Sequence, residues 1–320
     1  MKERIDPTPY QAERFYQHLR SAAEALGADF SESATKQALE VFDEEFSTCV
    51  VQTKAGSKPK TGLYYRFFYK GPNDLTQRAQ GAGMIAEGQS PIVTLQNEIL
   101  TAFPRATRAG LDFDAGFGLA KVWTFTGGPV PFEQFQRVSA IPQSVRDHAA
   151  FFAKHDLKDV FFVASDYQKQ TMNVYFGWDP LCRTKEWLET MMEETDSFPL
   201  SEETCREILE SQANSAGVGM TFSWQRPELL RWSLYSLDVP YDQSSDRKVR
   251  LPQLPQRLNT FRQQAPTLNE SPQFNVAWSF GREGYYLKLE KSYSRDATYF
   301  LTCEMGGDLS RSAPKLATVI

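Results

Sequence analysis

The stretch YYLKLEKSY, residues 285–293, alternates two kinds of side chain with a period of two. Leu287 and Leu289 fall on one face. The other face carries a phenol, a cation, a carboxylate and a hydroxyl, from Tyr286, Lys288, Glu290 and Ser292. Alternation of this period predicts a β-strand with one apolar and one polar face.

The same alternation returns in four earlier segments: LYYRFFY (63–69), LAKVWTF (119–125), TMNVYF (171–176) and LLRWSLYS (229–236). The residues that lead the polar faces are Arg66, Lys121, Thr171, Arg231 and Lys288. They recur at intervals of roughly 50 to 60 residues, and a fixed period of this kind indicates a repeated supersecondary unit. The pattern predicts five copies of one unit.

Each of these strands is preceded by a second predicted strand, and the segments between the pairs have helical periodicity. Helices that cover the apolar faces of ten antiparallel strands place the opposite faces inside a closed sheet. The predicted fold class is α+β: a ten-stranded antiparallel β-barrel surrounded by helices and built of five repeats. We expect one domain to span residues 1–320.

Composition excludes several classes of function. The net charge of -5 argues against a nucleic-acid binder that relies on general electrostatics. No apolar run has the length of a membrane span, and the four cysteines contain no CxxC pair, so neither a membrane anchor nor a metal site is predicted. We expect a cytoplasmic monomer that binds neither nucleic acid nor membrane.

A barrel of ten strands is too wide for side chains alone to fill, so its lumen is predicted to hold a ligand. The polar strand faces would line it with the cations Lys54, Arg66, Lys121, Arg231 and Lys288. Several cations in one chamber repel one another, and a phosphate or diphosphate is the anion that suits them. Thr171, Asn173 and Tyr175 add neutral hydrogen-bonding groups.

Aromatic residues share these faces: Phe68, Trp123, Tyr175 and Tyr235. Their π faces stabilise a cation within roughly 6 Å of the ring centre. Together with the basic residues, they favour a site that binds a diphosphate, lets it leave and shelters the remaining carbocation. Glu290 lies on the face of Lys288 and is a candidate proton acceptor. No aspartate-rich magnesium motif and no GxxxxGK[ST] loop occurs.

Four segments carry a resemblance to a known family: LYYRFF, DFDAGFGLAKVWTF, DLKDVFFVASDYQKQTMNVYF and NVAWSFGREGYYLKLEKSY. Over nearly its whole length the chain resembles the ABBA aromatic prenyltransferases, the αββα-barrel enzymes of microbial secondary metabolism. The resemblance is closest to the branch that prenylates 4-hydroxyphenylpyruvate and to related fungal enzymes that prenylate phenols. It implies dimethylallyl diphosphate as donor, an aromatic acceptor and electrophilic aromatic substitution.

The resemblance also implies roles for individual residues. Diphosphate binding falls to Lys54, Arg66, Lys121, Thr171, Asn173, Tyr175, Arg231 and Lys288, and catalysis to Glu290, Tyr175 and Lys121. The pocket for the allyl cation and acceptor comprises Phe68, Trp123, Phe161, Ser233, Tyr235, Trp278, Tyr286 and Ser292. Arg66 stands where the magnesium-dependent branch has a metal-holding aspartate, which implies an enzyme that requires no metal or other cofactor.

The chain departs from the family pattern at two positions. Phe161 replaces an arginine that could hold an acceptor carboxylate in the hydroxyphenylpyruvate enzymes, which favours an uncharged phenol such as a dihydroxynaphthalene. Gly219 replaces a phosphate-binding tyrosine of another branch.

Two alternatives remain open at this point. A non-catalytic barrel that carries a lipophilic molecule would have no use for several inward cations. An enzyme of the same fold could instead use geranyl diphosphate, and the depth of the pocket would decide between the two donors.

Overall fold

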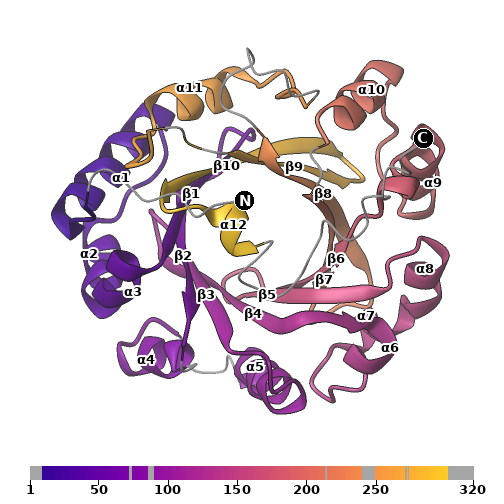
Figure 1. The fold of residues 1–320 in the computed structure, drawn as a ribbon, viewed down its shortest axis with the longest axis horizontal. Helices are drawn as coiled ribbons and strands as arrows, with labels where there is room; N and C mark the ends of the chain where they lie inside the picture. Colours follow the sequence, from indigo (N-terminus) through magenta and orange to yellow (C-terminus); the bar gives the residue numbers. More distant parts are fainter. Residues whose placement is uncertain are drawn as a thin grey trace, which may run out of the picture.

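The computed structural model describes residues 9–71, 74–85, 90–212, 215–239, 249–270, 272 and 274–301. Its strands form one closed antiparallel barrel in the order β1-β10-β9-β8-β7-β6-β5-β4-β3-β2 (Figure 1). The strands are β1 (Val50–Gly56), β2 (Tyr64–Lys70), β3 (Arg108–Asp114), β4 (Gly118–Pro131), β5 (Asp159–Asp166), β6 (Thr171–Gly177), β7 (Ser215–Ser223), β8 (Leu229–Val239), β9 (Phe274–Gly281) and β10 (Gly284–Ser294). The predicted barrel and its strand number are confirmed.

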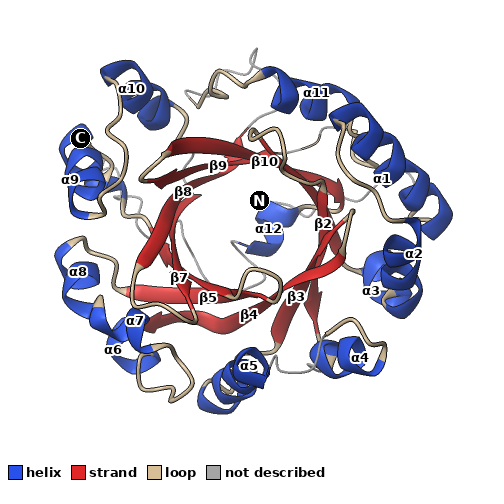
Figure 2. Cartoon of the chain, turned by 180° about the vertical axis from the view of Figure 1, so that it is seen from behind, coloured by secondary structure: helices blue, strands red, loops and turns tan. Residues whose placement is uncertain are grey.

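Helices surround the barrel in both views (Figures 1 and 2). They are α1 (Ala12–Leu26), α2 (Glu32–Val41), α3 (Asp43–Thr48), α4 (Leu75–Gly81), α5 (Ser90–Ala102), α6 (Phe132–Phe135), α7 (Gln143–Asp147), α8 (Ala149–Lys154), α9 (Lys185–Glu194), α10 (Glu202–Glu210) and α11 (Gln256–Gln264). The sequence also predicts a long surface loop over residues 239–255, of which 240–248 lie outside the described residues, as does the chain after 301, with Cys303.

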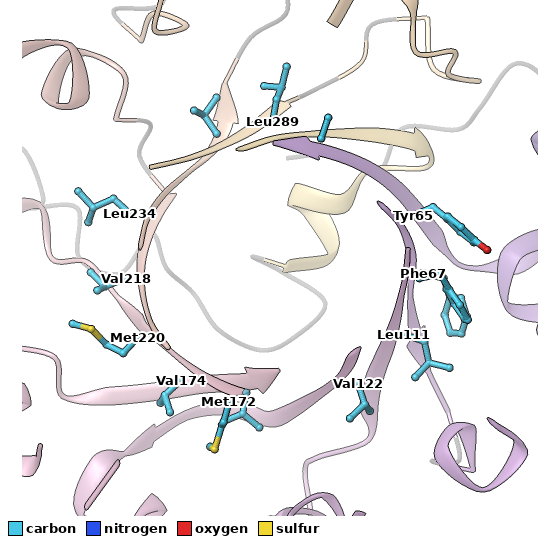
Figure 3. Close-up of a cluster of buried hydrophobic side chains, with 14 of the residues drawn as sticks. Tyr65, Phe67, Leu111, Val122, Met172, Val174, Val218, Met220, Leu234 and Leu289 are labelled. Atoms are coloured by element: carbon cyan, nitrogen blue, oxygen red, sulfur yellow. The ribbon is translucent and has the colours of Figure 1, made fainter. Parts of the chain in front are cut away.

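The hydrophobic core lies between the barrel and the helices. Outward side chains from successive strands, among them Tyr65, Val122, Val174 and Leu289, point away from the lumen (Figure 3). These residues have the parity that the alternating pattern assigns to the apolar face. The polar residues between them therefore face the lumen.

The structure corrects the predicted strand face at two positions. Trp278 belongs to the outer core, because it pairs with Leu234 and Leu287, which also face outward. It therefore does not line the acceptor pocket. Leu119 also packs in the outer core, because a register shift between β3 and β4 reverses the alternation just before Lys121.

The two ends of the barrel differ. The β-hairpin turns lie at one end, while the chain leaves β10 at the other end and forms the short helix α12 (Ala297–Tyr299). Both ribbon views place α12 within the ring of strands (Figures 1 and 2). The following ring, Phe300, stacks on Phe68 at 5.4 Å between centroids. This segment closes the lumen opposite the hairpins.

Among the described residues, no helix is both long and apolar enough to cross a membrane. In the same part of the chain, no group of three or more His, Cys, Asp or Glu side chains is arranged to hold a metal ion.

Candidate active site

A row of alternating charges crosses the lumen face. Arg66 pairs in register with Asp112, Asp112 with Lys121, and Lys121 with Asp166 on the next strand. Arg66 Nε lies 3.2 Å from Asp112 Oδ1, and Lys121 Nζ lies 3.1 Å from Asp166 Oδ2. Lys54 Nζ, from β1, also donates to Asp112 Oδ2 at 2.9 Å. These carboxylates offset three of the five cations predicted from the sequence.

Asp112 and Asp166 are functional residues that the sequence analysis missed. The expectation that only a ligand anion would balance the cations is therefore incomplete. Counting residues back through the β3–β4 turn would place Asp112 opposite Ala120, and only the register shift next to Phe113 brings it opposite Lys121, so the sequence pattern did not reveal this pair. Burial alone would raise the pKa of Asp112, but Arg66, Lys54 and Lys121 hold that pKa below its usual value.

Arg66 has a second carboxylate partner, Glu290. The guanidinium Nη2 of Arg66 donates a hydrogen bond to Glu290 Oε1 at 2.6 Å. Both side chains are almost fully buried. The guanidinium also lies 4.9 Å from the Trp123 ring centroid and 5.7 Å from that of Phe68. The lumen thus already places a cation against its aromatic rings.

Three further cations have no such partner. Lys169, Arg231 and Lys288 form no ion pair with any described carboxylate, although all three line the same cavity. Burial lowers the pKa of Lys288 to about 8, and the charges of Arg231, Lys54 and Lys121 act in the same direction, against an opposing effect of Tyr286. Lys169, in the β5–β6 turn, is a third site residue that the sequence analysis missed.

Several polar atoms beside these cations are buried without a hydrogen-bond partner among the described residues. They are Arg231 Nε, Thr171 Oγ1 and Asn173 Oδ1. Buried polar groups are ordinarily paired, so a cluster of unpaired ones indicates a place for a polar ligand. Asn173 is held in position because its Nδ2 donates to the Tyr175 hydroxyl at 2.9 Å.

Asn173 and the three cations line a cavity of about 680 Å³ at the hairpin end of the lumen. Its basic side chains are Lys54, Lys58, Lys60, Lys121, Lys169, Arg226, Arg231, Arg282 and Lys288. Its acidic side chains are Asp112, Glu228, Glu283 and Glu290. The excess of positive charge contrasts with the net charge of -5 of the whole chain. The cavity therefore suits a multiply charged anion.

Aromatic rings separate this cavity from a second, apolar pocket. Trp123 stacks on Tyr175 at 5.3 Å and 26°, and Tyr175 contacts Tyr235 at 5.6 Å. The deeper pocket is small, about 40 Å³, and its other walls include Phe68, Phe161, Phe162, Leu237 and Leu301. Four residues line both the basic cavity and the apolar pocket: Trp123, Tyr175, Tyr235 and Glu290. The basic cavity and the apolar pocket therefore meet at these residues.

The remaining predicted pocket residues occupy different places. Ser233 faces the lumen and hydrogen-bonds to Ser279 at 2.6 Å between hydroxyl oxygens. Ser292 Oγ accepts a hydrogen bond from the N–H of Ala297 at the start of α12, which places it against the closed end. Tyr286 lines the basic cavity rather than the apolar pocket.

Gly219 leaves space for the lumen aromatics. A Cβ at this position would lie 3.0 Å from Tyr175 Cε1 and 3.1 Å from Tyr235 Cε2. Its lack of a side chain therefore allows the two phenol rings to approach β7.

A helix-covered antiparallel barrel with a basic cavity above an aromatic pocket defines the class of αββα-barrel prenyltransferases. The sequence profile of the family "Aromatic prenyltransferase Orf2" matches residues 10–304. The chain belongs to this family and is an aromatic prenyltransferase.

Two characterised relatives cover most of the chain. A 4-hydroxyphenylpyruvate 3-dimethylallyltransferase of Streptomyces niveus is 31% identical over 92% of this chain and 88% of its own length. An aromatic prenyltransferase of Sclerotinia sclerotiorum is 31% identical over 90% of this chain and 92% of its own length.

A solved structure supports the fold. The 6-dimethylallyltryptophan synthase of Micromonospora olivasterospora, in complex with DMASPP and Trp, superimposes with a TM-score of 0.53. The match covers 88% of this chain and 97% of that chain at 11% identity. The barrel is thus shared with a protein of very different sequence.

Proposed function

We propose that this prenyltransferase transfers a dimethylallyl group from dimethylallyl diphosphate to an electron-rich phenol, without a metal ion. The observation that carries the proposal is the division of the lumen, in which unpaired cations face a cavity above stacked aromatic rings. The dimethylallyl donor is favoured because the Streptomyces niveus relative is named for that group.

In this proposal, the diphosphate lies against Arg231, Lys288 and Lys169 and accepts hydrogen bonds from Thr171 and Tyr175. Cleavage of the carbon–oxygen bond leaves the electron pair on the diphosphate, where fixed positive charge stabilises it. Arg231 and Lys288 are partly buried in the lumen, where fixed charges act more strongly than in bulk water and need no reorganisation during the reaction.

The allyl cation would then lie against the Trp123 and Tyr175 rings, whose π faces stabilise positive charge. The acceptor ring attacks it to form a carbon–carbon bond and a cationic arenium intermediate. Glu290 lies where the basic cavity meets the apolar pocket, so it is placed to take the proton that restores aromaticity.

The proposal of a metal-independent reaction rests on Arg66. Its guanidinium lies between the carboxylates of Asp112 and Glu290, so these two groups already have a cationic partner. A permanently charged guanidinium in this position supplies the positive charge that a bound cation would otherwise bring.

We further propose an uncharged phenolic acceptor, such as a dihydroxynaphthalene. The apolar pocket presents Phe161, Phe162 and Leu237, and its only charged lining residues in the described chain are Arg66 and Glu290, which pair with each other. An acceptor carboxylate, as in 4-hydroxyphenylpyruvate, would therefore find no free cation in that pocket.

The decisive experiment is an assay of product formation from dimethylallyl diphosphate and a panel of phenols, with EDTA or with added magnesium. The panel includes dihydroxynaphthalenes and 4-hydroxyphenylpyruvate, and geranyl diphosphate is tested as the competing donor. We expect turnover of a dihydroxynaphthalene that persists in EDTA. Loss of turnover in EDTA with recovery in magnesium would contradict the role of Arg66, and faster turnover with geranyl diphosphate would contradict the donor.

A further inference from the structure

Tyr286 is a half-buried phenol that faces basic side chains from five different elements of the barrel. Lys288 on the same strand and Lys58 in the β1–β2 turn approach its ring, with Nζ at 5.3 Å and 4.8 Å from the centroid. The other cations that act on its charge are Arg231 on β8, Lys121 on β4 and Lys169 in the β5–β6 turn.

Tyr286 pairs in register with Ser279 on β9, and both line the basic cavity. Ser279 is held by Ser233, at 2.6 Å between hydroxyl oxygens. Tyr286 therefore lies on the lumen wall within the cluster of cations.

The surroundings change the acidity of this phenol. Burial alone would raise its pKa, but Lys288, Arg231 and Lys121 outweigh burial and lower the pKa to about 7. A substantial fraction of Tyr286 is therefore a phenolate at neutral pH. Arg231 and Lys288 have no described carboxylate partner, so this phenolate is an anion available to them from within the chain.

We propose that Tyr286 is a proton-linked residue of the donor site: as a phenolate it serves as counter-anion to the empty cation cluster, and it takes up a proton when the diphosphate binds. The inference rests on the proposed diphosphate site. A diphosphate brings two or more negative charges next to the phenolate, which favours its neutral form. One proton is taken from solvent, and no covalent bond other than O–H is formed.

Protonation gives Tyr286 a second role in the same site. A phenolate only accepts hydrogen bonds, whereas a neutral phenol donates one, and a donor next to a phosphate oxygen makes a short, charge-assisted bond. Tyr286 thus replaces the diphosphate as the anion among the cations when it is a phenolate, and contacts the bound diphosphate when it is protonated. Lys58 and Lys169, both in hairpin turns, would move their interaction from the phenolate to the incoming anion.

The experiment follows the near-ultraviolet absorbance of tyrosinate in the wild-type protein and in Tyr286→Phe, with inorganic pyrophosphate as the probe. We expect wild type to show one additional ionisation with a midpoint near pH 7, absent from Tyr286→Phe. Saturating pyrophosphate at pH about 8 should remove that tyrosinate absorbance from wild type, because the bound anion raises the pKa. Sodium chloride at matched ionic strength should not.

Tyr285→Phe is the matched control. Tyr285 is the adjacent residue and is 41% exposed on the other face of β10, so this variant should keep the ionisation and the pyrophosphate response. Calorimetry on the same samples reports binding independently. If pyrophosphate binds and the tyrosinate signal stays, the inference is wrong while the donor site stands. If pyrophosphate does not bind to wild type, both are wrong.

Discussion

At the scale of single residues, two arginines on the lumen face have opposite surroundings. Arg66 is held between Asp112 and Glu290, whereas Arg231 has no carboxylate partner in the described chain. A charge with fixed counter-charges is part of the protein's own electrostatic balance. A charge without them is available to a ligand.

The first prediction follows from this difference. Arg231→Gln should lower kcat/KM for the donor on the order of 10²-fold, the usual effect of removing one group that stabilises developing charge. The melting temperature should change little, because no described ion pair is lost. Steady-state kinetics and thermal denaturation measure both effects.

Arg66→Gln is the matched comparison, and its effect should appear in stability. It leaves Asp112 and Glu290 buried without their guanidinium, and removing one partner of a buried ion pair costs about 3–5 kcal/mol. An Arg66→Gln protein as stable as wild type, or an Arg231→Gln protein with an unchanged KM and kcat, would contradict the division of roles.

The lysines of the lumen predict a dependence on pH. Burial lowers the pKa values of Lys54 and Lys288 to about 8 in the ligand-free protein. Only the protonated form attracts a diphosphate, so the charge is present below pH 8 and is lost as pH rises through 8. We expect kcat/KM for the donor to begin to fall near pH 7, where Tyr286 ionises, and to fall more steeply near 8, where these lysines lose their charge. In Lys288→Arg, the steeper fall should weaken, because a guanidinium stays protonated and only Lys54 still loses its charge near pH 8.

At the scale of elements, the period-two pattern predicted the second strand of each of the five hairpins and which of its faces looks inward. The pattern is informative because one face of each strand is buried against helices, so that apolar residues recur at every second position. The failures lie where the regularity stops. Leu119 changes face at a register shift that alternation alone cannot reveal, and Trp278 was assigned to the lumen although its parity with Val276 and Phe280 places it outside.

Pairs across strands were harder to predict than faces. The contacts of Arg66 with Asp112 and Glu290 depend on which strands are neighbours and on their register, and β1 meets β10 only when the barrel closes. Five of the cations and Glu290 were accordingly predicted, whereas Lys169 and the carboxylates of Asp112 and Asp166 were found only in the structure. The C-terminal wall of the apolar pocket, with Leu301, has no signal in the strand pattern.

The segment after β10 leads to a prediction about acceptor size. Leu301 lines the apolar pocket, whose volume of about 40 Å³ makes its size sensitive to a single side chain. Leu301→Ala should deepen the pocket and raise the ratio of kcat/KM for a two-ring phenol to that for a one-ring phenol. The KM for the donor should stay the same, since Leu301 does not line the basic cavity.

Leu234→Ala is the control for that variant. Leu234 belongs to the outer core on β8, and truncation of a buried leucine costs about 2–5 kcal/mol. This variant should lose stability without changing the ratio between the two acceptors. An equal ratio in Leu301→Ala and wild type would show that the C-terminal segment does not set the size of the acceptor.

At the scale of the whole molecule, the barrel separates charge between its ends. The hairpin end carries the cavity with nine basic and four acidic side chains, although the chain as a whole is acidic. At the opposite end, Phe300 and Leu301 cover the lumen with apolar surface. The closed sheet thus concentrates positive charge at the entrance that the anionic donor of the proposed reaction would use.

This arrangement predicts that salt acts on donor capture more than on chemistry. Charges at the mouth attract the diphosphate over a distance limited by the Debye length, about 10 Å at 0.1 M salt. We expect kcat/KM for the donor to fall as sodium chloride is raised, while kcat at saturating donor changes little, because the buried charges are screened less. Lys60→Ala and Arg282→Ala, at the rim, should reduce the slope of this dependence and leave kcat unchanged. A salt effect equal in kcat and kcat/KM, or a slope that the rim variants do not alter, would show that the mouth does not steer the donor.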